Sequence, residues 1–451
     1  MQPSLTQVLG DFVAMTKTSD IPAAVVTRAK VSLVHNLTMA MAGRSRETVA
    51  HVMAKQCWPL PAQATLLHDG TLVSAEAAAF ANGALMHARS QDDTHAGSTS
   101  HPGAAVMPAA LAIAEAEGRT GAEFLTAVVL GYEILARIGR DFDHLVTARG
   151  FRAAAVFGGF GSTVAATKLL RLSAEQSGHA LGLAAHLAGG LTQVWEEGSA
   201  EGPLQLGFAA RNGLLAAQAA QAGATSARAI LEGRRGFYRA YAGTSEPAVE
   251  ALDGLGETWQ FAEITVKPYP VCAILQGPVD AMLHLLRTHA IAPSAVQEVV
   301  LELNPYEAAY PGVDNPGPFA SNIATKMSAH FSMALTLSDR RMTMDDLFRF
   351  GDSTIEALAS RVRVVPDATV PMRLSRLQVH TLDGRTYVRE VVVPVGQPSF
   401  DEVAAFARSL TVEIGTGVER IDRLVAEITN LDKAPNLAGL ITSLCADRSN
   451  V

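Results

Sequence analysis

The polar stretch at residues 87–103, HARSQDDTHAGSTSHPG, carries the side chains best suited to chemistry. It holds three histidines and two adjacent aspartates between two alanine-rich segments with almost no charge. An imidazole with a pKa of about 6.5 can move a proton near neutral pH, and a carboxylate can orient that imidazole. The stretch therefore predicts proton transfer or, as an alternative, a metal site formed by Asp92, Asp93, His95 and His101.

Within this stretch, His101 has the most favourable position for catalysis. It directly precedes Pro102 at the start of a predicted helix, where backbone amides favour a bound anion. In contrast, we expect His87 to be a hydrogen-bonded helix residue and His95 to be an exposed loop residue. The spacing of His95 and His101 in a loop defines no metal geometry, which makes the metal alternative the weaker one.

The elements around the polar stretch are mainly helices. Apolar residues recur at three- and four-residue spacing through most of the first 260 positions. The predicted helices cover residues 22–43, 74–88, 102–118, 121–142, 157–172, 173–191 and 203–223.

The pattern changes near Thr265 and changes back near Pro398. Residues 296–304 alternate as a strand does, and residues 373–395 form two alternating runs around Asp383-Gly384, a typical hairpin turn. Helical periodicity returns after Pro398. The sequence therefore predicts a mostly α fold, in which a large all-α domain (1–264 and 398–451) is interrupted by an α+β lid domain (265–397).

Composition limits the classes of partner. Hydrophobic residues make up 48% and charged residues only 18% of the chain, against a usual charged share of roughly 25%, which favours a large buried core and an oligomer. A net charge of −8 argues against nucleic-acid binding. We expect no membrane span, since no apolar run reaches about 18 residues, and no secretion signal; a cytoplasmic location follows from these expectations.

Four separated motifs resemble the MmgE/PrpD family, and they occur in the family's order. They are Asn82-Gly83 through His101-Pro102, residues 150–173, residues 202–220, and Lys267-Pro268-Tyr269-Pro270 with Cys272. Members of this family include dehydratases, decarboxylases and epimerases. The resemblance implies a catalytic cleft between a helical domain and a lid, a small carboxylated substrate, no cofactor or metal, and a homodimer.

The resemblance also implies the site residues. His101, Lys267 and Asp93 are the expected catalytic residues. Lys267 can hold a carboxylate or, if burial lowers its pKa, act as a second acid or base. A guanidinium fork at Arg152 suits a substrate carboxylate. The full set of expected substrate-binding residues is Asp92, Thr94, Arg152, Gln205, Tyr269 and Gln276.

Several positions depart from the family pattern. Gly202, Gln205 and Gln276 stand where the family has groups that can carry positive charge. Other departures are Ser90 for an aspartate, Arg152 for a histidine, and Phe331, beside His330, for a tyrosine of the lid. The loss of cationic positions predicts a substrate with fewer carboxylates than a tricarboxylate.

The leading hypothesis is a cofactor-independent lyase or isomerase that moves a proton next to a carboxylate. One alternative is an epimerase or racemase of a dicarboxylate, with His101 and Lys267 on opposite faces of the carbon acid. Another is a degenerate family member that binds a ligand without catalysis. Retention of both His101 and Lys267 argues against the last of these, since a protein that only binds has no need of the pair. Cys272 is expected to be a packing residue rather than a nucleophile.

Overall fold

The computed structural model describes residues 3–244, 246, 248–392 and 397–445, and most of them are helical. The chain separates into two compact units. The first consists of Met1–Leu191, Pro203–Val266 and Pro398–Val451, and the second of Thr192–Gly202 and Lys267–Gln397. The predicted fold class, mostly α with an α+β part, is confirmed. The second unit also includes Thr192–Gly202, which the sequence pattern assigns to the helical domain.

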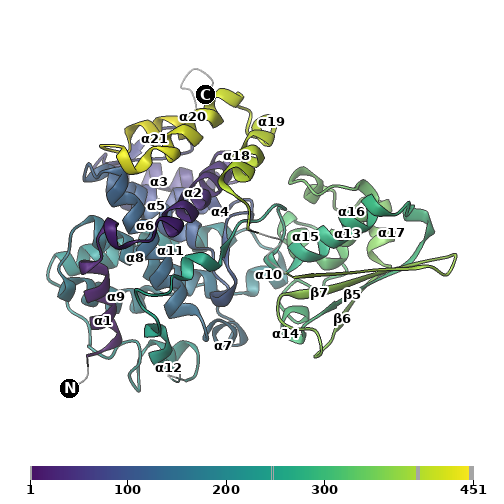
Figure 1. Cartoon of the computed structure of the whole chain (residues 1–451), viewed down its shortest axis with the longest axis horizontal. Coiled ribbons are helices and arrows are strands. Elements are labelled where there is room, and N and C mark those ends of the chain that lie inside the picture. The colour runs from purple at the N-terminus through teal and green to yellow at the C-terminus, as the bar shows by residue number, and fades with distance from the viewer. Residues whose placement is uncertain (1–2, 245, 247, 393–396, 446–451) are drawn as a thin grey trace. The chain divides into compact units, whose positions relative to one another are not determined.

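The first unit is a bundle of long helices joined by shorter ones (Figure 1). Each of the seven long helices predicted from periodicity is present, with ends that differ by up to four residues. The long helices are α2 (Ala23–Gly43), α4 (Ala75–His87), α5 (Pro102–Ala116), α6 (Gly121–Gly139), α8 (Ala153–Leu169), α9 (Ala174–Leu187) and α11 (Gly202–Gln221). The shorter ones are α1 (Leu5–Met15), α3 (Val49–Cys57), α7 (Asp143–Ala148), α12 (Phe237–Tyr241), α18 (Phe400–Ser409), α19 (Thr411–Ile414), α20 (Val418–Thr429) and α21 (Ala438–Leu444).

Small residues let the central helices approach closely. A Cβ atom built on Gly131 of α6 would lie 2.8 Å from the carbonyl oxygen of Gly161 on α8 and 2.6 Å from Val106 on α5. A Cβ atom built on Gly161 would likewise lie 2.8 Å from the carbonyl oxygen of Gly131. Glycine at both positions is therefore needed for the two backbones to cross at this separation, and α5, α6 and α8 form one almost wholly buried layer.

The first unit is assembled from segments far apart in sequence. Helices α18 and α20, near the C-terminus, pack against α2, and the yellow and purple ribbons lie together in Figure 1. Their apolar residues Val403, Ile421 and Leu424 belong to the same core as Leu33 and Leu37 of α2. The C-terminal segment therefore completes the hydrophobic core that the N-terminal helices begin.

The second unit is built on a mixed four-stranded sheet in the order β6-β5-β7-β8. Its strands are β5 (Val296–Leu303), β6 (Val362–Pro366), β7 (Leu374–Thr381) and β8 (Thr386–Val392). The pair β5–β6 is parallel and the other pairs are antiparallel. Its helices are α10 (Gln193–Glu197), α13 (Gln276–Thr288), α14 (Pro305–Ala308), α15 (Asn322–Met327), α16 (Ala329–Asp339) and α17 (Ser353–Ala359).

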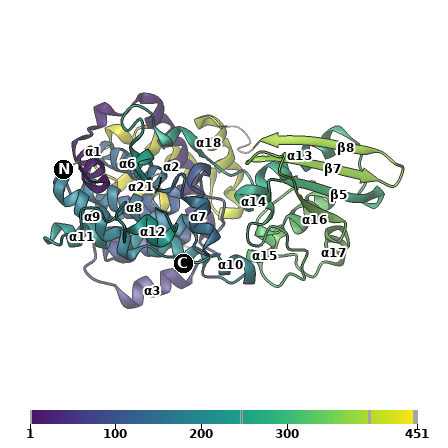
Figure 2. The same cartoon turned by 90° about the horizontal axis from the view of Figure 1, so that it is seen from below.

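Helices α13 and α16 pack on the sheet of the second unit (Figure 2). The predicted strand and the predicted hairpin are present as β5 and as β7 with β8, and Gly384 adopts the left-handed conformation (φ +84°) that the turn requires. Residues 393–395 of the predicted hairpin lie outside the described residues. Strand β6 was not predicted, because its short apolar run directly follows helix α17 without a turn signal.

Part of the polar stretch forms a short strand rather than an irregular loop. Strand β3 (Thr94–His95) pairs antiparallel with β4 (Ile264–Thr265), so that Thr94 faces Thr265. The two hydroxyl oxygens lie 3.0 Å apart. A second small hairpin, β1 (Ala64–Thr65) with β2 (Leu72–Val73), lies in the same unit. The β3–β4 pair holds the polar stretch beside the segment that leads to Lys267.

A buried arginine on α6 holds the loop at residues 251–260 in place. Arg137 Nε donates to Glu133 Oε1 over 2.6 Å, and Glu133 Oε2 accepts the backbone N–H of Gln260 over 2.7 Å. The remaining guanidinium nitrogens donate to the backbone carbonyls of Ala251, Asp253, Gly254 and Thr258. This single cation therefore satisfies carbonyl groups along a loop that has little regular structure of its own.

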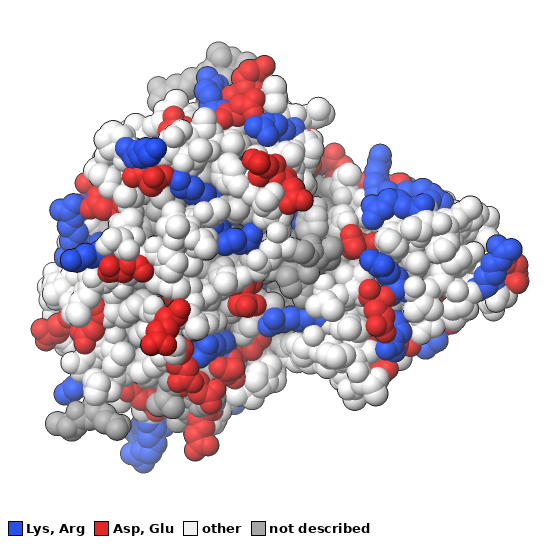
Figure 3. All heavy atoms as spheres, in the orientation of Figure 1, with Lys and Arg blue, Asp and Glu red and all other residues white. Residues whose placement is uncertain are grey.

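Basic and acidic side chains are interspersed on the face drawn in Figure 3. This mixture agrees with the modest net charge of −8. Among the residues that the structure describes, none of the helices combines the length and apolarity needed to cross a bilayer.

Candidate active site

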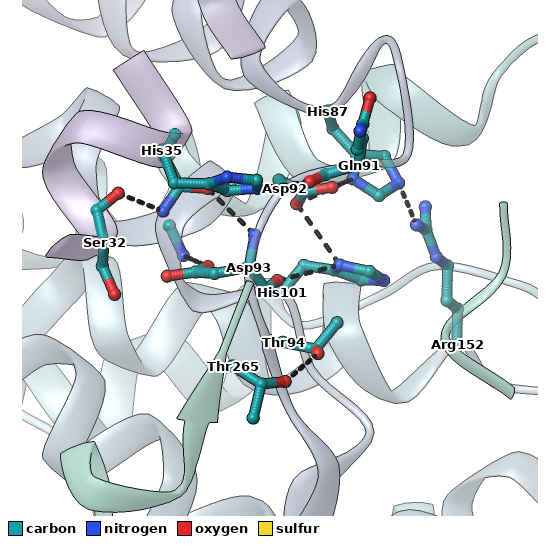
Figure 4. A network of polar contacts seen from close by, with 12 residues as sticks. Ser32, His35, His87, Gln91, Asp92, Asp93, Thr94, His101, Arg152 and Thr265 are labelled. Atoms are coloured by element: carbon teal, nitrogen blue, oxygen red, sulfur yellow. Dashed lines mark hydrogen bonds and ion pairs between the residues drawn. The ribbon is translucent and has the colours of Figure 1, made fainter. Parts of the chain in front are cut away.

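Asp92 lies at the centre of a buried polar network in the first unit (Figure 4). Its carboxylate is 2.9 Å from Nδ1 of His87, in the last turn of α4, and 3.3 Å from Nδ1 of His101, which precedes α5. The two imidazole rings meet at an angle of 63° with their centroids 4.7 Å apart. Asp92 and His87 are fully buried, whereas the side chain of His101 is 17% exposed. His101 is therefore the member of this network that a substrate can reach.

Arg152 extends the network on the far side of His87. It precedes α8, is buried, and places Nη2 2.6 Å from Nε2 of His87. A guanidinium can only donate hydrogen bonds, so Nε2 of His87 is the acceptor. The proton of the neutral imidazole is then on Nδ1, from which it is donated to Asp92. Nη1 of Arg152 also donates to Oε1 of Gln205 at 3.5 Å.

The electrostatics of the network agree with this hydrogen-bond pattern. Burial lowers the pKa of His87 to about 3, so its ring is neutral at physiological pH. Burial alone would raise the pKa of the Asp92 carboxyl, but the imidazoles of His87 and His101 hold that pKa well below its usual range. Asp92 is therefore an ionised carboxylate that accepts N–H donors from both rings.

The side chain of Asp93 points away from Asp92 and makes other contacts, while the backbone carbonyl of Asp93 also lies 3.3 Å from Nδ1 of His101. Its side chain accepts the backbone N–H of Gly103 over 2.9 Å and the hydroxyl of Tyr132 over 2.8 Å. Its own backbone N–H donates to Asn36 Oδ1 over 3.0 Å. These contacts join α2, α5 and α6 at the first turn of α5. They support a positioning role for Asp93, which holds the helix start that follows His101.

The pH dependence of stability tests this placement of Asp93. Burial raises the pKa of its carboxyl to about 6, against about 3.9 in an unfolded chain. Between these two values the folded protein binds more protons than the unfolded chain, so stability falls as pH rises and changes no further above about 6. The contribution amounts to roughly 3 kcal/mol, from about 1.4 kcal/mol for each pKa unit.

Replacing Asp93 by asparagine should remove this contribution to the slope of the unfolding free energy against pH. Urea unfolding of both proteins from pH 4 to pH 7 gives the comparison, and the slope rather than the absolute stability is the readout, since asparagine also loses a hydrogen bond. Equal slopes in the two proteins would show that Asp93 does not titrate in this window.

The structure does not bring together the four residues of the metal alternative. His95 is buried rather than exposed, contrary to expectation, and its Nδ1 lies 2.8 Å from Ser98 Oγ. Within the described ranges, the ligand atoms that do converge, within 4.8 Å of one another, are those of His87, Asp92 and His101. The guanidinium of Arg152 touches this group, and its charge opposes a second cation there. The donor set therefore fits a hydrogen-bonded network better than a metal site.

Two further predicted residues lie in the first unit. Thr94 contacts Thr265 through the β3–β4 pair. Gln205 near the start of α11 accepts from Arg152 and donates through Nε2 to the carbonyl of Leu191 at 3.2 Å. Gln205 therefore lies beside the buried network, while the hydroxyl of Thr94 is engaged in joining the two short strands.

The remaining predicted residues lie in the second unit. Lys267 is buried. The side chain of Gln276 accepts the N–H of Tyr269 and donates to the carbonyls of Tyr269 and Val271, with distances of 3.1, 2.9 and 3.0 Å. Gln276 therefore fixes the backbone conformation of the segment that follows Lys267, which supports a positioning role.

The aromatic and thiol groups of this segment keep their protons. Burial raises the pKa of Tyr269 to about 12, and its hydroxyl lies 3.4 Å from Asp280 Oδ1. Burial also raises the pKa of the Cys272 thiol. Cys272 packs against the apolar cores of the second unit, as expected of a packing residue rather than a nucleophile.

Sequence reasoning missed His87 as a member of this network. The available signal was its position in the last turn of a helix, five residues before an aspartate pair. Asn36 and Tyr132, which hold Asp93, carried no comparable signal, because each is one of several polar residues within a helix far from the polar stretch in sequence.

The fold and the polar network together define a class of protein. A protein of this class has a discontinuous helical unit, an inserted mixed-sheet unit, and a buried aspartate in contact with a partly exposed histidine. The chain belongs to the MmgE/PrpD family: the MmgE/PrpD N-terminal domain model matches residues 7–250 and the C-terminal domain model matches residues 269–405. The resemblance read from the four motifs is thus confirmed.

Curated relatives match at modest identity. The chain is 27% identical to a cis-aconitate decarboxylase of Aspergillus terreus (strain NIH 2624 / FGSC A1156), over 95% of this chain and 93% of the relative. It is 29% identical to a cis-aconitate decarboxylase-like protein of Aspergillus oryzae, over 63% of this chain and 62% of the relative. The human cis-aconitate decarboxylase is 27% identical over 58% of this chain and 55% of the relative. These identities are those of a divergent member.

Proposed function

We propose that this protein is a cofactor-independent lyase that moves a proton next to a carboxylate on a small carboxylic acid. The observation that carries the proposal is the contact between Asp92 and His101. Because the Asp92 carboxylate accepts from Nδ1, Nε2 of His101 is the ring nitrogen with a lone pair for a substrate proton. The names of the relatives, a cis-aconitate decarboxylase and a cis-aconitate decarboxylase-like protein, support the same reaction class.

Two cations support the binding of a carboxylate. The charge of Arg152 can stabilise a substrate carboxylate or the negative charge that develops on proton removal. Lys267 is the second cation, and the chain limits its distance from the polar stretch. It follows Thr265 by two residues, a span of at most about 7 Å between α-carbons, and Thr265 pairs with Thr94. We propose Lys267 as a carboxylate ligand or as a second acid or base.

The neutral residues Gly202, Gln205 and Gln276 favour a substrate with fewer carboxylates than a tricarboxylate. They also support the alternative function, epimerisation or racemisation of a dicarboxylate, which needs a proton acceptor and donor but no departing group. We further propose that the protein acts as a homodimer. Its low share of charged residues, 18%, supports this, as do the exposed apolar side chains of Phe208 and Leu215 on one helix.

A substrate screen in deuterated water tests the function. Mono-, di- and tricarboxylates are incubated with the protein and followed by proton NMR and mass spectrometry. We expect one of them to gain deuterium at the carbon next to a carboxylate. Loss of water or carbon dioxide from that compound identifies a lyase, and exchange with inversion and no loss identifies the epimerase. A carboxylate that raises the melting temperature, with neither exchange nor product from any compound, would mean that the protein binds without catalysis.

A further inference from the structure

His87 contacts an ionised group at each of its two ring nitrogens. Nδ1 lies 2.9 Å from the Asp92 carboxylate, and Nε2 lies 2.6 Å from the Arg152 guanidinium. His87 is the last residue of α4. Its ring is 1% exposed and lies between Asp92 and Arg152, the residue that precedes α8. Both ring nitrogens of His87 are therefore engaged within the protein, whereas the side chain of His101 is 17% exposed.

A nearby histidine shows what a purely structural role looks like. His35 of α2 is equally buried, at 1% exposure. Its Nε2 lies 2.6 Å from the backbone carbonyl of Gln91, a neutral group that any N–H donor could satisfy. His87 differs because a carboxylate on one side and a guanidinium on the other permit only one neutral tautomer, with the proton on Nδ1.

We propose that His87 is a positioning residue. It holds the Asp92 carboxylate so that this carboxylate accepts the Nδ1 proton of His101, which leaves Nε2 of His101 to act as the base. The part concerning the base rests on the function proposed above. A buried carboxylate needs hydrogen-bond donors to compensate for its lost hydration. The Nδ1–H of His87 is such a donor to Asp92, and Arg152 fixes which nitrogen of His87 provides it. The order of contacts is Arg152, His87, Asp92 and then His101.

Nitrogen NMR of the imidazole rings, without substrate, tests the positioning directly. The protein contains 13 histidines, so the His101 signals are assigned by their loss in a His101→Gln variant. We expect His101 to carry its proton on Nδ1 in the wild type. In His87→Phe, the phenyl ring offers no donor to Asp92. A substantial fraction of the His101 rings should then carry the proton on Nε2. His87→Asn, whose amide can donate near the position of Nδ1, should restore much of the original signal.

Kinetics on the substrate found in the screen gives the second readout. Removing a residue that orients a reacting group typically costs about 10- to 100-fold, so His87→Phe should lower kcat by that factor and leave KM nearly unchanged. His87→Asn should recover most of the loss. His35→Phe is the matched control: it removes an equally buried imidazole, and it should leave the His101 tautomer unchanged. Where His87→Phe does not fold, His87→Gln replaces it, with the same expected shift.

Three results separate the possibilities. An unchanged His101 tautomer in folded His87→Phe, or in His87→Gln where that variant replaces it, would overturn the inference. An equal shift in His35→Phe would also overturn it, since the effect would then be a general loosening of the polar stretch. A shifted tautomer, in a protein that turns over no carboxylate even as the wild type, would uphold the positioning and reject the proposed function.

Discussion

Replacing His101 by alanine is expected to lower kcat by roughly 10²–10⁴, the usual contribution of a positioned acid or base. The expectation follows from the network: His101 is its partly exposed member, and the Asp92 carboxylate, 3.3 Å from Nδ1, favours the tautomer with the lone pair on Nε2. Steady-state kinetics on the substrate identified by the carboxylate screen measures the effect. Proton exchange into that substrate should fall by a similar factor.

His95→Ala is the control from the same polar stretch. His95 contacts Ser98 rather than Asp92, so its loss should reduce kcat far less. Because His95 is buried, melting temperatures of both variants must be measured alongside the rates. Near wild-type turnover in His101→Ala together with an inactive but folded His95→Ala would mean that the catalytic histidine has been misassigned.

Replacing Arg137 by methionine should lower the free energy of unfolding by about 3–5 kcal/mol, because breaking a buried ion pair leaves an uncompensated charge. Glu133 would lose its cation, and four backbone carbonyls of the loop would lose their donors. Burial already raises the pKa of Glu133, and the Arg137 charge opposes that rise. Urea unfolding at pH 7, followed by circular dichroism, measures the loss.

Two variants examine the cause of that loss. Arg171→Met removes a pair between Glu123 and an arginine whose side chain is 66% exposed, and exposed pairs contribute at most about 1 kcal/mol. Adding Glu133→Gln to Arg137→Met should restore part of the stability, because the buried carboxylate is then gone. A loss in Arg137→Met no larger than that in Arg171→Met would contradict the role of the buried pair.

Periodicity predicted the helices of this fold because each long helix buries a broad apolar face in a shared core. The same reasoning failed for β6, whose five residues follow a helix with no intervening Gly, Pro or Asn. It also failed for β3 and β4. Each is two residues long, and their pairing depends on segments about 170 positions apart, a separation that no local pattern encodes.

The candidate site was predictable by residue type but not by orientation. Asp92 and Asp93 are adjacent and chemically identical, yet one faces two imidazoles and the other faces Gly103 and Tyr132. Their different surroundings arise from α2 and α6, which no spacing rule connects to the polar stretch. His95 is buried for the same kind of reason, since its backbone pairs with Ile264 of β4.

The discontinuity of the first unit bears on the order in which a nascent chain can fold. A ribosome releases the chain from its N-terminus, and domains generally fold as units during synthesis. Helices α18 and α20 contribute to the same core as α2, and they emerge after residues 267–397. The sheet of the second unit can therefore close while the helical core still lacks its last helices. During that interval the side of α2 that packs on α18 and α20 has no partner from this chain, and it is the surface that a molecular chaperone would need to shield.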